Sequence, residues 1–156
     1  MKPDNLLIFS LVSILVLSGI YCKKDETTGP QDTDLEGTWT ANADVSGTKM
    51  EFDATDSVPE LKQDIVLLGG SITITVLNAR YTLISVEPGK APTTDSGAFA
   101  AANNTITLTS DDPEEDVLVF LYTRNGDFIT LNTTGVDFPN TSIPAKLTIV
   151  LKKIGT

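Results

Sequence analysis

The segment Ser71-Ile-Thr-Ile-Thr-Val76 alternates apolar and polar side chains, and Asn104-Thr-Ile-Thr-Leu-Thr109 repeats the pattern. In a β-strand, a period of two places successive side chains on opposite faces, so one face meets a core and the other meets water. Threonine is favoured on exposed strand faces. These two segments predict an all-β fold built from half-buried strands.

The chain from residue 35 onward carries the same alternation in further short runs. The Asn125-Gly126 pair between two runs predicts a hairpin, because both residues tolerate the positive φ of a type I′ turn. About nine strands in hairpin order are typical of a barrel or a sandwich. The other strands are predicted at residues 79–86, 97–101, 117–122, 127–132 and 146–152, with weaker ones at 37–43 and 48–52.

One segment departs from the β pattern. Ser57 and Glu60 stand in capping-box relation, and apolar residues follow at helical spacing before Gly69-Gly70. We therefore predict one short helix over 58–68. It would serve as a lid over an open barrel end or as a static cover for it.

The opening Leu35-Glu-Gly-Thr-Trp-Thr40 is similar to the Gly-x-Trp first strand of lipocalins and lipocalin-like bacterial lipoproteins, with Gly37 and Trp39 in its two positions. The resemblance implies a small antiparallel up-and-down barrel, with a β-sandwich as the alternative. It also implies that Trp39 packs across the closed end beneath a basic side chain, Lys152 or Lys153. The similarity continues through Gly97–Phe99, the Asn-Asn turn before Ile106 and Leu108, Gly126–Leu131 and Leu151–Ile154.

The same resemblance implies reversible binding of a small hydrophobic molecule inside the barrel. Eight-stranded barrels are just wide enough to fill with their own side chains or to hold one small ligand. Each candidate lining residue therefore has plain core packing as its alternative. These candidates are Ile72, Ile74, Tyr81, Leu83, Phe99, Leu118, Phe120 and Tyr122.

The N-terminus carries a basic start at Lys2 and an apolar run from Leu6 to Leu17, followed by the small residues Ser18 and Gly19, then Ile20-Tyr21, and then Cys22. This order is typical of a secretory signal peptide and resembles the lipobox of bacterial lipoproteins. The resemblance implies cleavage after residue 21, lipid attached at Cys22, and a cell-envelope protein anchored in the outer membrane. Residues 22–34 contain no large apolar side chain and predict a flexible tether, followed by the lipocalin-like domain at 35–156.

Composition narrows the function further. A net charge of −10 argues against nucleic-acid binding. The chain has no histidine, and Cys22 is its single cysteine, so disulfides, zinc sites and the usual catalytic bases are not expected. The acidic run Asp111–Asp116 is interpreted as a solvated loop, not a calcium site.

We therefore expect a non-enzymatic, lipid-anchored binding protein without a cofactor or metal. The alternative is an anchored β domain that acts through its outer surface in adhesion, assembly or inhibition. The sequence does not identify a protein partner.

Overall fold

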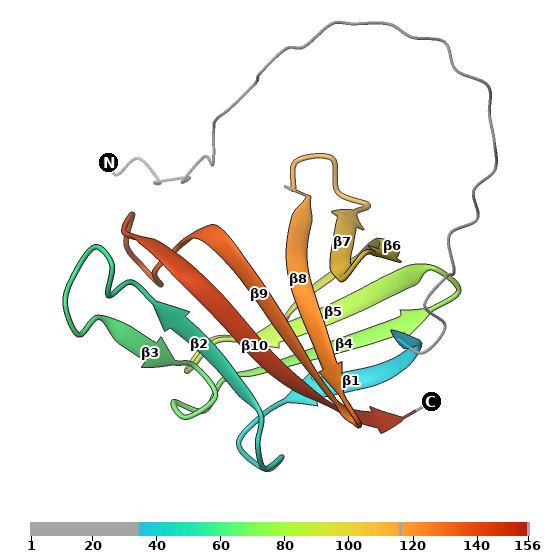
Figure 1. The fold of residues 1–156 in the computed structure, drawn as a ribbon, viewed down its shortest axis with the longest axis horizontal. Helices are drawn as coiled ribbons and strands as arrows, with labels where there is room; N and C mark the ends of the chain where they lie inside the picture. The colour runs from blue at the N-terminus through green and yellow to red at the C-terminus, as the bar shows by residue number, and fades with distance from the viewer. Residues whose placement is uncertain (1–34, 116, 156) are drawn as a thin grey trace, which may run out of the picture.

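The computed structural model describes residues 35–115 and 117–155. Ten β-strands follow one another along this part of the chain, and every pairing between them is antiparallel (Figure 1). The predicted leader, Cys22 and the tether lie outside the described residues. The strands are β1 (Gly37–Ala41), β2 (Lys49–Asp53), β3 (Lys62–Asp64), β4 (Ser71–Leu77), β5 (Arg80–Val86), β6 (Thr93–Ala102), β7 (Thr105–Ser110), β8 (Leu118–Asn125), β9 (Phe128–Asp137) and β10 (Pro144–Gly155).

Eight of the strands close into a barrel. The order β1-β4-β5-β6-β7-β8-β9-β10 returns to its start because β1 also pairs with β10. Each strand from β4 to β9 pairs with the next one along the chain, which is the up-and-down arrangement. Closure confirms the barrel and excludes the sandwich, because a sandwich consists of two separate packed sheets.

The long strand β10 makes this closure possible. On one edge it pairs with β9, and on the other it pairs with both β1 and β2. Thr40 lies opposite Lys152, whereas Lys49 lies opposite Val150, so β1 and β2 follow each other along the same edge. Strand β3 pairs only with β2, and the two form an outer pair beside the barrel.

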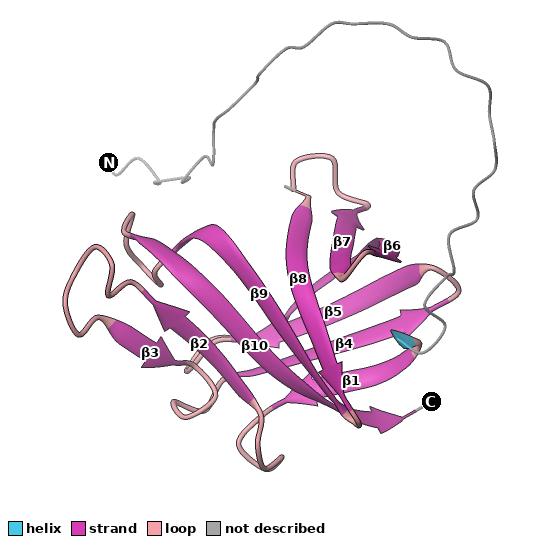
Figure 2. Cartoon of the chain, in the orientation of Figure 1, coloured by secondary structure: helices cyan, strands magenta, loops and turns pink. Residues whose placement is uncertain are grey.

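The predicted helix over 58–68 is wrong. Residues 62–64 form β3 instead, and within the described chain helical geometry is confined to Leu35 (Figure 2). Glu60 has φ 68°, a left-handed conformation that a helix cannot continue through. Moreover, Ile65 is 4% exposed but Leu68 is 53% exposed, so the residues of the predicted apolar helix face are not buried together.

All of the other predicted strands are present, with shifts at their ends. The 125–126 hairpin also forms, but its turn sits one residue later than predicted. Asn125 pairs with Phe128, which leaves Gly126 and Asp127 as the central residues. Only Gly126 has a positive φ (59°), which is the pattern of a type II′ turn and not of type I′.

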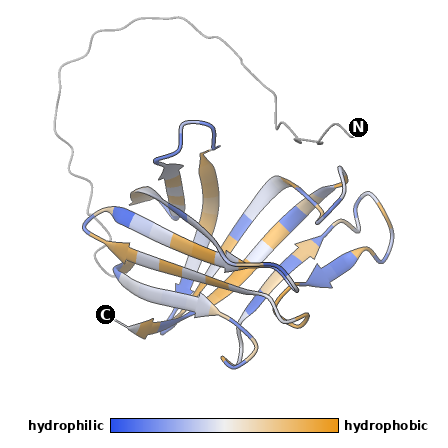
Figure 3. Ribbon diagram, turned by 180° about the vertical axis from the view of Figure 1, so that it is seen from behind, coloured by the Kyte–Doolittle hydropathy of each residue, from blue (hydrophilic) through white to orange (hydrophobic). Residues whose placement is uncertain are grey.

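Hydrophobic and hydrophilic residues alternate along the strands (Figure 3), and the buried hydrophobic ones form the core inside the barrel. Strand β4 shows this most plainly, with Ile72, Ile74 and Val76 buried and the threonines between them only partly buried. Burial therefore alternates along the strand with the same period of two that the sequence shows. The buried cluster takes in residues from β1, β4, β5 and from β7 to β10.

Two tight hairpins at the Trp39 end use left-handed residues. Asn78 and Ala79 have φ 52° and 56°, and Asn103 and Asn104 have φ 51° and 60°. Both are two-residue turns, since Leu77 pairs with Arg80 and Ala102 with Thr105. Asparagine tolerates this left-handed conformation. Alanine is destabilised in it, because its Cβ crowds the backbone.

Replacing Ala79 with glycine should therefore raise the free energy of unfolding by about 0.5–1 kcal/mol, because glycine adopts positive φ without steric cost. Chemical denaturation measures the change. Ala98→Gly is the matched control: Ala98 is exposed on β6 beside Arg80, where added backbone freedom should lower stability. A loss of stability for both variants would contradict the turn geometry.

Candidate functional site: the barrel interior and its mouth

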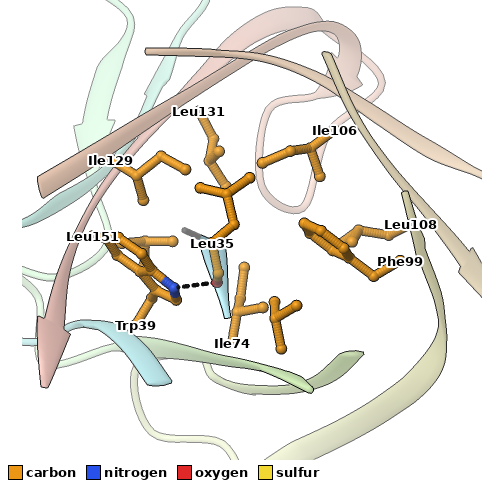
Figure 4. Close-up of a pocket in the computed structure, with 10 residues that line it drawn as sticks. Leu35, Trp39, Ile74, Phe99, Ile106, Leu108, Ile129, Leu131 and Leu151 are labelled. Carbon is orange, nitrogen blue, oxygen red and sulfur yellow. Dashed lines mark hydrogen bonds between the residues drawn. The ribbon is translucent and has the colours of Figure 1, made fainter. Parts of the chain in front are cut away.

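One end of the barrel is closed around Trp39. This side chain is 2% exposed, and its indole Nε1 donates a hydrogen bond of 2.9 Å to the Leu35 carbonyl oxygen (Figure 4). Lys153 Nζ lies 5.5 Å from the ring centroid, and the Arg124 guanidinium carbon lies 5.7 Å from it. Two cations therefore cover the indole, a favourable arrangement for a π-system. Lys152 is over Phe128 instead.

Gly37 is required where β1 meets β10. Its φ is +123°, and a Cβ added there would lie 2.4 Å from the Gly155 carbonyl oxygen. Any other residue would push these two strands apart at the seam. Gly37 and Trp39 thus occupy the position where the barrel closes.

The interior beside Trp39 is almost completely filled. Only about 20 Å³ of space remains, close to the volume that one water molecule needs. Figure 4 shows the lining side chains converging on Leu35, which occupies the centre of this end. They are all apolar: Leu35, Trp39, Ile74, Val76, Phe99, Ile106, Leu108, Ile129, Leu131 and Leu151.

The predicted lining residues are mostly core residues. Ile72, Ile74, Tyr81 and Phe120 are buried in the main cluster. Leu83, Phe99 and Tyr122 are half-buried and pack against it. Leu118 is 37% exposed at the start of β8.

Among these candidates, only Ile74 and Phe99 line the small space beside Trp39. The structure therefore brings seven of the eight predicted residues together as a packed interior and leaves Leu118 outside it.

A larger cavity, of about 230 Å³, lies at the opposite end of the barrel. Its walls come from β2, from the ends of β4, β5 and β9, and from the segments that follow β3, β5 and β9. We call this space the mouth cavity. Its lining residues are Met50, Phe52, Ile65, Ser71, Ser85, Val86, Glu87, Lys90, Asp137, Pro139 and Asn140.

The apolar wall of the mouth cavity includes Met50 and Phe52. Both side chains are half-buried and pack against the main core. Phe52 also contacts Phe138 edge to face, with 6.4 Å between ring centroids, and so joins a second small cluster around Ala54 and Ala145. Phe52 therefore packs against both clusters, and Met50 against the main one.

Charged side chains tie the outer strands β2 and β3 together. Lys62 Nζ lies 3.2 Å from Glu51 Oε1 and 3.6 Å from Asp53 Oδ2. The pKa of Lys62 is raised, first by its hydrogen bond to Glu51 and then by the charge of that carboxylate. The Lys62 ammonium is exposed and both carboxylates are partly exposed, so water screens the pairs and they fix register more than they add stability.

Sequence reasoning missed the mouth cavity. The segment 48–52 showed only weak alternation, and Ile65 was assigned to a helix. The remaining walls are strand ends and loops, which carry no periodic signal. The alternation of Met50 and Phe52 with charged neighbours was the one signal that could have indicated a wall.

A polar network ties β5, β6 and β7 together. The Tyr81 hydroxyl donates to Asp95, and Ser110 Oγ donates to the same carboxylate at 2.6 Å. Tyr81 is 2% exposed. Burial raises its pKa to about 12, and its hydrogen bond to Asp95 adds to the effect because it holds the phenol in its neutral form.

Comparison with known proteins found no relatives. No family model, no curated protein and no solved structure matches the chain.

In the part of the chain that the structure describes, no three acidic or cysteine side chains gather in a way that could hold a metal ion. No helix formed by these residues has the length and apolar character needed to cross a membrane.

We predict that Tyr81→Phe lowers the free energy of unfolding by about 1–2 kcal/mol at neutral pH, because the Asp95 carboxylate loses a buried donor. Since the folded pKa of about 12 exceeds the ordinary tyrosine pKa of 10.0, the phenol's contribution is complete below pH 10. That contribution is lost as the pH rises toward 12.

The difference between the two proteins should therefore narrow over this range in denaturant unfolding. The phenolate absorbance step near pH 12 should also vanish in the variant. An energy difference that does not change with pH would be evidence against this role.

Proposed function

We propose that this domain binds a small, mainly apolar molecule in the mouth cavity and leaves it chemically unchanged. The supporting observation is a space of about 230 Å³ at one end of a closed barrel whose interior is otherwise filled. Ligand pockets for drug-sized molecules begin near 300 Å³, so the guest is small.

The filled interior favours this location. A ligand beside Trp39 would have to displace packed side chains such as Leu35 or Leu108, both nearly inaccessible to solvent. In the mouth cavity it would instead cover Met50 and Phe52, which are already partly exposed. Displacing water from apolar surface is the driving force available to it.

The lining groups favour binding over catalysis. The chain has no histidine to act as a general base. The Ser85 hydroxyl lies 2.7 Å from the Thr93 hydroxyl, a partner that does not activate a nucleophile. The proposal also includes attachment to the outer membrane through a lipidated Cys22, which rests on the sequence resemblance alone.

Met50 provides a direct test, because the chain has only two methionines, Met1 and Met50. Labelling the methionine methyl carbons gives an NMR spectrum in which one signal reports on the mouth cavity. Titration with 1-hexanol, a short neutral amphiphile, should shift the Met50 signal to saturation, and Met1 adds no signal once the predicted leader is removed.

Ser71→Leu should weaken this binding by at least about tenfold, since the larger side chain occupies part of the cavity. Thr82→Leu is the matched control, because Thr82 is exposed on β5 and does not line the cavity. If Met50 shows no saturable shift, or if both variants lose binding equally, the proposed function is wrong.

A second candidate function is supported by the outer face of β8. Val119 and Leu121 point away from the core and are 49% and 64% exposed. Val117, just before the strand, is 54% exposed. Figure 3 shows this apolar strand beside the hydrophilic loop that joins β7 to β8. We call Val117, Val119 and Leu121 the β8 strip.

Charge indicates which partner would fit the β8 strip. The adjacent loop contributes Asp111, Asp112, Glu114 and Glu115, all exposed. With a net charge of −10, a second copy of the chain would be repelled. The favoured occupant is therefore a protein segment with apolar side chains and flanking basic ones.

A synthetic peptide of alternating leucine and lysine represents this chemistry. It should bind the protein with an affinity that falls as salt is added, and Leu121→Lys should reduce that affinity about tenfold or more. Thr82→Lys carries the same charge on the outer face of β5 and serves as the control. Equal binding by both variants would assign the interaction to net charge alone and remove the β8 strip as a site.

A further inference from the structure

We propose that the mouth cavity selects amphiphiles with a cationic or hydrogen-bond-donating end group, which meets the Asp137 carboxylate, and discriminates against fatty-acid carboxylates. This inference rests on the proposed function, since it concerns the ligand of the same cavity. It is drawn from the charges that line the cavity and from their partners.

The lining is chemically divided among the strands. Strand β2 contributes the apolar Met50 and Phe52, whereas the β5–β6 loop contributes Glu87 and Lys90. Asp137, the last residue of β9, adds a second carboxylate. A bound molecule therefore meets both an apolar wall and charged groups, which suits an amphiphile better than a pure hydrocarbon.

The charges of the lining do not balance. The Lys90 ammonium is already paired with Glu87, three residues earlier in the same loop. Across the described residues, no lysine or arginine forms an ion pair with Asp137. The half-buried Asp137 carboxylate thus carries the uncompensated negative charge of the lining.

An ionised carboxylate only accepts hydrogen bonds, so its best partners are ammonium and hydroxyl groups. A second carboxylate brought near it is repelled, and partial burial strengthens that repulsion because screening by water is reduced. The order of affinity expected from the cavity is ammonium first, hydroxyl second and carboxylate last. The size of the cavity adds a preference for short chains.

The experiment uses the whole purified protein labelled at its methionine methyl groups, titrated separately with hexylammonium, 1-hexanol and hexanoate at neutral pH. These probes share one alkyl chain and differ only in the end group. From the Met50 signal, hexylammonium should bind at least about tenfold more tightly than hexanoate, with hexanol between them. The difference in affinity between hexylammonium and hexanoate should become smaller at high salt.

Two variants test the assignment. Asp137→Asn keeps the shape of the side chain but removes its charge, and should reduce the gap between hexylammonium and hexanoate to less than about threefold. Glu87→Gln releases Lys90 from its partner and should tighten hexanoate binding. Glu115→Gln, an exposed carboxylate outside the cavity, should leave all three affinities unchanged.

The outcomes separate the two proposals. If none of the three probes saturates the Met50 signal, the proposed function itself fails. If the probes bind with equal affinity, or hexanoate binds best, binding stands and the selectivity is overturned. A preference for hexylammonium that survives Asp137→Asn would overturn the role of this residue.

Discussion

The pairing of one strand, β10, with three others is the constraint on which this structure depends. Its last residues close the barrel against β1, while its middle holds β2 on the same edge. Because β1 is short, the seam is closed only at the Trp39 end. Beyond Ala41, the outer pair β2 and β3 continues along β10, and β3 ends the sheet. The mouth cavity between this pair and the ends of β4 and β5 is thus a consequence of how the barrel closes.

The same constraint explains why the two ends of the barrel differ. At the closed end, Leu35 and Trp39 fill the interior, and Lys153 from β10 and Arg124 from β8 cover the indole. The hairpin turns at this end have two residues each, which leaves little backbone to move. At the other end the connections are longer, at 87–92, 111–117 and 138–143. An eight-stranded barrel has a limited interior. Here side chains fill it at the closed end, while a cavity remains at the mouth.

The sequence predicts the barrel well because its signals are local. Alternation in 71–76 and 104–109 corresponds directly to burial in β4 and β7. The helix over 58–68 failed because the spacing of Val58, Leu61 and Ile65 fits a helix by chance, while pairing with β2 satisfies the backbone of 62–64. The mouth cavity was not predictable, since its walls meet only once β2 lies on β10. The exposure of Leu118 was not predictable either, because it is the first residue of β8, at the last pair of the β7–β8 ladder.

The residues that pack the closed end and the residues that line the mouth cavity are different, so the two sets can be substituted independently. Residues that close the barrel, such as Gly37 and Trp39, do not touch the mouth cavity, and no residue of the mouth lining fills the space beside Trp39. Changes in the charged part of the lining therefore alter the surroundings of a ligand while the core stays intact. Asp137 and Lys90 lie at a strand end and in a loop, where substitutions cost little stability. The barrel thus combines an apolar wall at Phe52, which packs against the core, with a charged rim that can change independently of it.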